Sequence, residues 1–103
     1  MENVSFENTL ISNTGIQVLI SGSLEIRDAA EIKNELLLLL TNHGHVELHF
    51  KNIEKIDLTA LQLLMALSRS ASDQGKKVDY IFEPTAYISE VLNNSGFNKF
   101  ISV

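Results

Sequence analysis

The second half of the chain alternates between strand-like and helix-like segments, and this alternation restricts the folds that the chain can adopt. Residues 45–50 read HVELHF, in which polar and apolar residues alternate as they do along a half-buried strand. Apolar residues then recur at helical spacing over residues 58–74, and a second strand pattern covers residues 78–82. A further helix is predicted from Pro84 to about Ser95. Strands that alternate with helices pair in parallel through right-handed crossovers, so we expect parallel pairing here.

The first half of the chain predicts two strands and one helix. Residues 4–12 and 16–21 are strand candidates separated by an Asn-Thr-Gly turn, so they should form an antiparallel hairpin. A helix follows over residues 28–42, where Asp28 and Glu31 have the spacing of a capping box. The predicted order of elements is therefore β-β-α-β-α-β-α.

A hairpin joined to parallel strands makes a mixed sheet. We assign the chain to the α/β class, as one domain over residues 1–103, with a mixed β-sheet flanked by α-helices on at least one face. Leu37 and Leu38 widen the apolar stripe of the first helix, so they either complete the core or form a contact patch. Phe97 and Phe100 are predicted to close the core after the last helix.

Composition excludes several classes of function. The chain has 13 acidic and 8 basic residues and a formal net charge of −5, which disfavours nucleic acid as a partner. It has no cysteine, and its first residues lack the basic and apolar segments of a signal peptide. The longest apolar run, Leu36–Leu40, is far shorter than the roughly 20 residues that span a bilayer. We expect a cytoplasmic protein without direct membrane insertion.

Two interpretations fit residues 57–59 at the start of the helix over residues 58–74. In the first, either Thr59 with Gln62 or Asp57 caps the helix, and each role is worth about 1 kcal/mol. In the second, Thr59 is phosphorylated, because the free N–H groups and the dipole of a helix start stabilise a phosphate. The added charge of about −1.5 to −2 would alter the surface beside Asp57. Local chemistry alone favours capping.

The chain as a whole resembles the STAS domain family, which comprises the anti-sigma factor antagonists and their relatives. The resemblance covers about residues 16–100 and is specific in the order and spacing of its parts. Four segments carry it: SGSLEIRDAAEIKNEL, VELHFKNIEKIDLTALQLLMAL, GKKVDYIF and EPTAYISEVLNNSGFNKFI. The family's mixed sheet with flanking helices agrees with the order of elements predicted above.

The resemblance implies a role for the residues around Thr59. The antagonists carry a regulatory phosphoserine at the third position of an Asp-Ser-Ser-Gly motif, which here reads Asp57-Leu58-Thr59-Ala60. The phosphorylation site therefore falls on Thr59, and the implied partner-binding residues are Asp57, Leu58, Ala60 and Glu25. Glu25 stands where the family usually has aspartate. Leu58 and Ala60 replace a hydroxyl residue and a glycine, which indicates a divergent branch.

Two functions follow from this resemblance. The first is a phosphorylatable protein-interaction module, which binds a serine/threonine kinase-type partner resembling the anti-sigma kinases and is regulated at Thr59. The alternative is a constitutive STAS subunit of a transporter of the lipid-exporting or ABC type, or of a chemotaxis or other signalling complex. In that case no phosphorylation occurs and Thr59 only caps its helix.

Catalysis and cofactor binding have little support in the sequence. There is no Gly-x-Ser-x-Gly motif and no glycine-rich phosphate loop, so we expect no enzyme activity and no cofactor. His45 and His49 would point the same way on a strand but lie roughly 13 Å apart, too far for one metal ion. His43 could lie closer to His45, yet no neighbouring cysteine or carboxylate pattern supports a zinc site. We therefore predict no metal site.

Overall fold

The computed structural model describes residues 4–83 and 85–96, which form one four-stranded sheet and three α-helices. The elements along the chain are β1 (Val4–Leu10), β2 (Gly15–Leu24), a short 3₁₀ helix (Ile26–Asp28), α1 (Ala29–Asn42), β3 (His45–Ile56), α2 (Leu58–Asp73), β4 (Lys77–Phe82) and α3 (Ala86–Ser95). This order confirms the predicted β-β-α-β-α-β-α arrangement.

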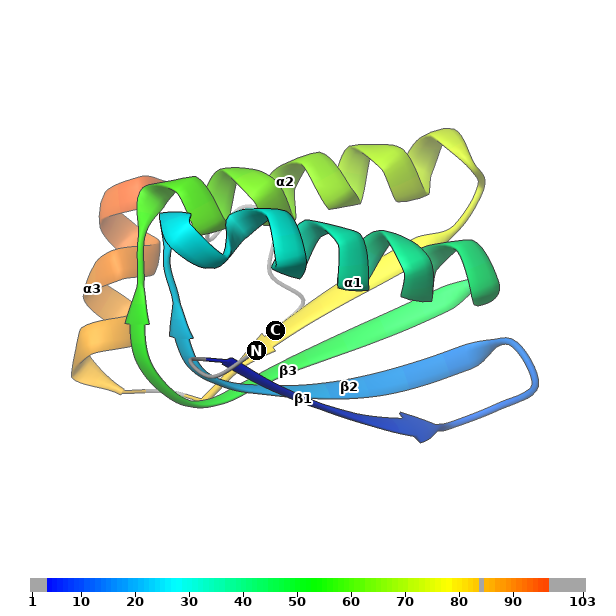
Figure 1. The fold of residues 1–103 in the computed structure, drawn as a ribbon, viewed down its shortest axis with the longest axis horizontal. Coiled ribbons are helices and arrows are strands. Elements are labelled where there is room, and N and C mark those ends of the chain that lie inside the picture. The colour runs from blue at the N-terminus through cyan, green and yellow to red at the C-terminus, as the bar shows by residue number, and fades with distance from the viewer. Residues whose placement is uncertain (1–3, 84, 97–103) are drawn as a thin grey trace.

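The sheet is mixed, as the sequence predicted. Its strand order is β1-β2-β3-β4, with β1 antiparallel to β2 and the other two pairs parallel. α1 and α2 lie side by side over one face of the sheet, and α3 lies at the end of the sheet where β3 finishes (Figure 1). The opposite face is not covered by any of these three helices.

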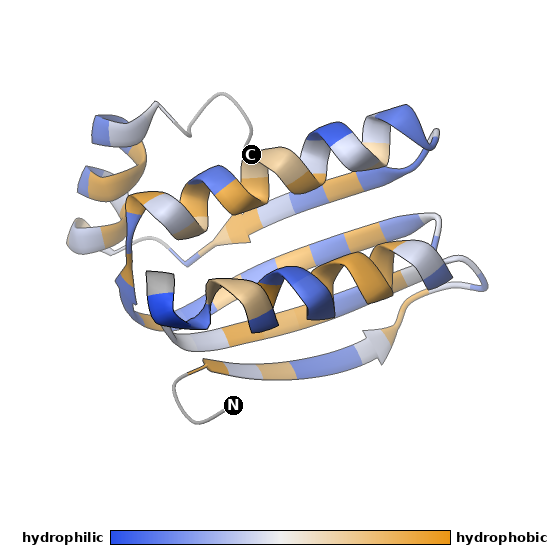
Figure 2. Ribbon diagram, turned by 45° about the horizontal axis from the view of Figure 1, so that its top comes forward, coloured by the Kyte–Doolittle hydropathy of each residue, from blue (hydrophilic) through white to orange (hydrophobic). Residues whose placement is uncertain are grey.

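Alternation along the strands separates the core from the open face. In β3, the side chains of Val46, Leu48 and Phe50 are buried beneath the helices, while the residues between them are partly exposed. Figure 2 shows the same alternation of hydrophilic and hydrophobic residues along the strands. Burying one aliphatic side chain stabilises the fold by about 1.5–3 kcal/mol, so this alternation sets which face the helices cover.

β3 continues well beyond the predicted end at residue 50, up to Ile56. The sequence predicts no regular element between the strand over residues 45–50 and the helix that begins at residue 58. Instead, Asn52 adopts a left-handed conformation with φ 55° and the pairing with β2 shifts register around Gly22, whose φ is 104°. Asparagine and glycine tolerate this region, so the irregularity bends both strands without ending them.

Two of the predicted helix starts need correction. Asp28 makes no side-chain capping bond at the start of α1, so the proposed Asp28–Glu31 capping box does not form. Pro84, predicted to begin the last helix, lies outside the described residues, and α3 begins instead at Ala86. The Thr85 hydroxyl caps it by accepting a hydrogen bond from the Ile88 N–H at 3.1 Å. Phe97 and Phe100 also lie outside the described residues.

A buried tyrosine ties α2 to the sheet. The Tyr80 hydroxyl of β4 donates to the Leu64 carbonyl oxygen of α2 at 2.6 Å and is hydrogen-bonded to the Ser68 hydroxyl at 2.5 Å. Burial raises the pKa of Tyr80 to about 12, although the Ser68 hydrogen bond acts in the opposite direction. The phenol therefore stays neutral in the folded protein and links two layers of the core.

Candidate functional site

The start of α2 follows the last residue of β3 directly, so residues 57–60 lie where the sheet meets the helices. Asp57 has extended backbone, and its carboxylate accepts a hydrogen bond from the Ala60 N–H at 2.9 Å. Asp57 is therefore the cap, and the alternative capping box formed by Thr59 and Gln62 is wrong. The cap leaves the Thr59 side chain free for another role.

Thr59 lies in the first turn of α2 and is partly exposed to solvent. Its hydroxyl makes no hydrogen bond to any other described residue. The turn also carries the positive end of the helix dipole, which favours an anion at this position. A group attached to this hydroxyl would lie in the turn that the Asp57 carboxylate caps.

The turn that follows β2 lies beside the start of α2. The Asp57 N–H donates to the Leu24 carbonyl oxygen at 3.2 Å, which places the next residue, Glu25, close to the Asp57 backbone. The Glu25 carboxylate lies 3.6 Å from Arg27 Nε and 3.9 Å from Lys55 Nζ. The fold thus brings together two acidic residues, Glu25 and Asp57, that are far apart in the sequence.

The remaining two predicted partner-binding residues have opposite environments. Leu58 is 58% exposed, which is unusual for leucine and fits a contact surface. Ala60 is only 1% exposed and belongs to the core, so its methyl group cannot touch a partner in this conformation. Its replacement of glycine therefore bears on packing beneath the helix and not on how closely a partner approaches.

Sequence reasoning missed one residue of this surface, Tyr87 at the start of α3. The Tyr87 hydroxyl accepts from the Ile56 N–H at 2.9 Å and lies 3.3 Å from the Ile56 carbonyl oxygen. These bonds fix the ring near the start of α2, while 40% of Tyr87 stays exposed. Its only signal in the sequence was an aromatic residue at a non-core position of an amphipathic helix.

A second group of polar side chains lies on the open face of the sheet. His45, Glu47 and Asp79 each offer one ligand atom, and these three atoms all lie within 4.8 Å of one another. The sequence analysis did not find this group because Asp79 is far along the chain and arrives on the neighbouring strand. His49 is not one of the three residues, but its Nε2 lies 2.5 Å from Glu47 Oε1.

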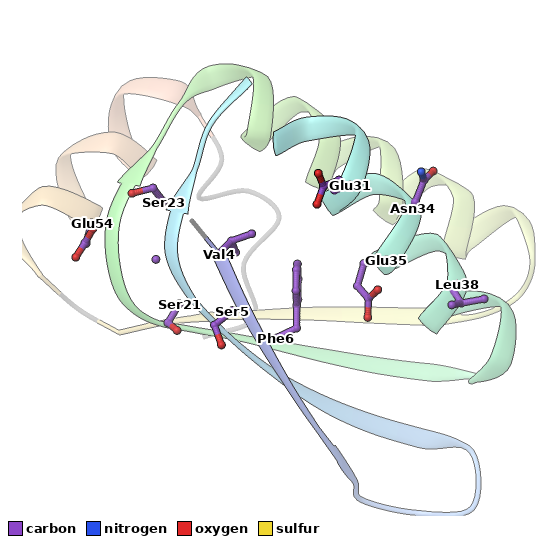
Figure 3. Close-up of a pocket in the computed structure, with 11 residues that line it drawn as sticks. Val4, Ser5, Phe6, Ser21, Ser23, Glu31, Asn34, Glu35, Leu38 and Glu54 are labelled. Atoms are coloured by element: carbon purple, nitrogen blue, oxygen red, sulfur yellow. The ribbon is translucent and has the colours of Figure 1, made fainter. Parts of the chain in front are cut away.

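An open groove of about 940 Å³ lies between the start of β1 and α1 (Figure 3). Its walls include Phe6, Glu31, Glu35 and Leu38, the last of which is 59% exposed. Leu38 thus belongs to the surface, whereas Leu37 packs against the core. None of the predicted site residues lines this groove.

One known protein family matches most of the chain. The family described as "Mlab, STAS domain" matches residues 10–102. No curated protein sequence matches the chain. Among the described residues, no helix has the length and apolar character needed to cross a membrane.

Three solved structures share the fold at low sequence identity. The anti-sigma factor antagonist SpoIIAA in its unphosphorylated form aligns with a TM-score of 0.76 at 12% identity, covering 95% of this chain and 86% of that chain. The Bacillus cell fate determinant SpoIIAA in its phosphorylated form aligns with a TM-score of 0.69 at 12% identity, over 95% and 89%. The NMR structure of the protein TM1081 gives 0.75 at 17% identity, over 95% and 78%.

Proposed function

This chain belongs to the STAS domain family, and on that premise we propose that it is a non-enzymatic protein-interaction module, regulated by phosphorylation of Thr59. The observation that carries this proposal is the capping of α2 by Asp57. Because the aspartate fills the capping role, the threonine hydroxyl is not needed to hold the helix. It lies in the first turn, partly exposed, where a phosphate can be accepted without unfolding the helix.

The proposed binding surface consists of Glu25, Asp57, Leu58, Thr59 and Tyr87. Leu58 and Tyr87 supply exposed apolar area, and Glu25 and Asp57 supply negative charge. This combination suits a protein partner with an apolar patch edged by basic side chains. Replacing the Thr59 hydroxyl proton with a phosphoryl group adds a charge of about −1.5 to −2 and considerable bulk in the middle of this surface.

Phosphorylation would release such a partner by two physical effects. The phosphate would separate the Leu58 side chain from its apolar contact, since the two residues are adjacent on the first turn. It would also place a second negative group beside Asp57 at the interface. Any acidic side chain of the partner near this position would then be repelled, and like charges at an interface cost several kcal/mol. The partner is proposed to be a serine/threonine kinase-type protein that modifies Thr59 and then dissociates.

The test uses the partner recovered with the wild-type chain from cells that produce it. Thr59→Glu should lower affinity by about tenfold or more, whereas Thr59→Ala should keep it. Ser72→Glu is the matched control, since Ser72 is exposed at the far end of the same helix and the substitution adds the same charge. Incubation with the partner and ATP, followed by mass spectrometry, should place the phosphate on Thr59. Phosphate on another residue, or none, contradicts the proposal.

A second candidate function is a constitutive STAS subunit of a transporter or signalling complex. Leu58 and Ala60 in place of the antagonists' serine and glycine favour it, as does a family match described as Mlab and not as an antagonist. The same surface would then hold its partner permanently. Unchanged affinity in Thr59→Glu, together with loss of affinity in Leu58→Asp, would support this function over the regulated one.

A further inference from the structure

The open face of the sheet carries a group of ligand-type side chains far from the start of α2. β3 and β4 run parallel, and their register pairs Glu47 directly with Asp79 and His45 with Lys77. Residues two apart on a strand point to the same face, so His45 and Glu47 both face solvent on the side that the helices leave open. Thr59 follows the other end of β3, which is 12 residues long (Figure 1).

The atoms of this group already lie at near-coordinating separations. His45 Nε2 and Asp79 Oδ2 are 2.8 Å apart, and one atom from each of His45, Glu47 and Asp79 lies within 4.8 Å of the others. Around a tetrahedral zinc ion with bonds of 2.0–2.2 Å, ligand atoms are roughly 3.4 Å apart. Side-chain rotations that move each ligand atom by about 1 Å would therefore bring all three atoms to one ion, without any change in the backbone.

The charges of the group favour a cation at this position. Glu47 and Asp79 are carboxylates directly opposite each other on neighbouring strands, and like charges in such a pair destabilise a sheet. Their side chains are only 24% and 15% exposed, so water screens them incompletely. Lys77 Nζ also lies 3.7 Å from Asp79 Oδ2, but its side chain is 70% exposed, so water screens its charge.

A neighbouring histidine positions one of the carboxylates. His49 Nε2 lies 2.5 Å from Glu47 Oε1, from the next outward-facing position on the same strand. A hydrogen bond of this kind holds a carboxylate in a fixed orientation, as the outer partners of metal ligands do. His49 itself is not one of the three grouped residues, so its role is to orient Glu47 and leave the other carboxylate oxygen for binding.

We propose that His45, Glu47 and Asp79 bind a divalent transition-metal ion of the zinc type on the open face of the sheet. One imidazole nitrogen and two carboxylate oxygens are ligands that zinc accepts, and three protein ligands leave a fourth position for water or for a group from another molecule. The ion would replace the hydrogen bond between His45 Nε2 and Asp79 Oδ2 and would neutralise the paired carboxylates. Because the site is separate from Thr59, it stands or falls independently of the function proposed above.

The experiment titrates zinc chloride into the untagged full chain near neutral pH and measures heat by calorimetry. The expected result is one ion per chain. Asp79→Asn and Glu47→Gln keep the shape of each side chain and should each weaken binding at least about tenfold, as should His45→Ala. Cobalt(II), used in place of zinc, should give the visible absorption bands of a four-coordinate ion, and these should disappear in Asp79→Asn.

Two control variants separate this site from general surface binding. His43→Ala removes a partly buried histidine just before β3 that lies outside the group, so zinc affinity should not change. Lys77→Ala removes the cation nearest Asp79 and should leave affinity equal or higher. Thermal unfolding without metal shows whether each variant is folded, and zinc should raise the unfolding temperature of the wild-type chain.

Three results would overturn the proposal. The first is an absence of binding up to about 1 mM zinc, which corresponds to a free energy too small for a built site. The second is binding that persists at wild-type strength in both Asp79→Asn and Glu47→Gln, which are the variants least able to disturb folding. The third is an equal loss in His43→Ala, which would assign the ion to the loop before β3.

Discussion

An aspartate occupies the N-cap position of both α1 and α2, but only the one before α2 caps its helix with its side chain. Asp57 precedes α2 with φ −102° and ψ 173°, and its carboxylate accepts from the Ala60 N–H. Asp28 precedes α1 with φ −101° and ψ −2°, and makes no capping bond. A capping side chain reaches its N–H only from extended backbone, so the preceding segment decides which aspartate works as a cap.

What comes before each helix explains this difference. β3 runs in extended conformation up to the start of α2, whereas a 3₁₀ turn precedes α1 and the Asp28 N–H donates to the Glu25 carbonyl oxygen at 2.9 Å. The Asp28 carboxylate is consequently turned inward, with Oδ2 buried and without a hydrogen bond. The start of α1 must therefore be held by packing and that of α2 by its cap, while further along the helix Tyr80 links α2 to β4.

The largest effect is expected from removing packing at the start of α1. Ile32 lies in the first turn of α1 and is 1% exposed. Ile32→Ala should lower the free energy of unfolding by about 2–5 kcal/mol, because it removes buried methylene groups and leaves a cavity. Urea unfolding measures this loss, and Glu31→Ala, at an exposed neighbour, is the control. A loss below about 1 kcal/mol would show that packing does not hold this helix start.

The next effect concerns the polar link between α2 and β4 at high pH. The pKa of Tyr80 is raised to about 12 in the folded chain, above the ordinary value of 10.0 that the unfolded chain has. The neutral phenol thus stabilises the folded state fully below pH 10. This contribution, about 2–3 kcal/mol, should be lost progressively as the pH rises from about 10 to about 12.

Comparison with Tyr80→Phe isolates this titration from that of other groups. The variant lacks the phenol, so it should be less stable at neutral pH, and the difference from the wild type should shrink as the pH rises above 10. Denaturant unfolding at a series of pH values measures both chains. A difference that stays constant up to pH 12 would mean that Tyr80 ionises equally easily in the folded and unfolded chains.

The smallest effect tests the two aspartates directly. Asp57→Ala should cost about 1 kcal/mol, the usual value of a lost cap. Asp28→Ala should cost less, since Asp28 Oδ2 has no hydrogen bond and only a long ion pair with the exposed Arg27 at 3.8 Å. Thermal and urea unfolding of both variants measure the contrast. Equal losses would indicate that Asp28 supports its helix in a way that its geometry does not suggest.

Most of the fold could be predicted from local patterns. The alternation in residues 45–50 assigned Val46 and Leu48 to the core, and the helical spacing over 58–74 gave α2 to within one residue of its end. The predicted strand ends at residue 50, whereas β3 continues to Ile56. The bend at Asn52 and the register shift opposite it depend on how two strands pair, which one segment alone does not reveal.

The candidate site was predictable to a similar degree. The family resemblance assigned Thr59, Asp57 and Glu25 to one surface, and the fold brings the turn after β2 beside the start of α2. Ala60 was assigned to the same surface as the last position of the motif, but the helix turns its methyl group into the core. Tyr87 was missed because its place beside Ile56 comes from the packing of α3, about 30 residues later in the chain.

The sequence by itself determined the order of the helices and strands, most of the residues of the hydrophobic core and the family to which the chain belongs. Periodicity and composition act along the chain, and burial of apolar surface follows from them. The tertiary structure alone decided which aspartate caps a helix and which carboxylate meets His45. Both depend on backbone conformation and strand register, which are set by the packing of segments that are distant in sequence.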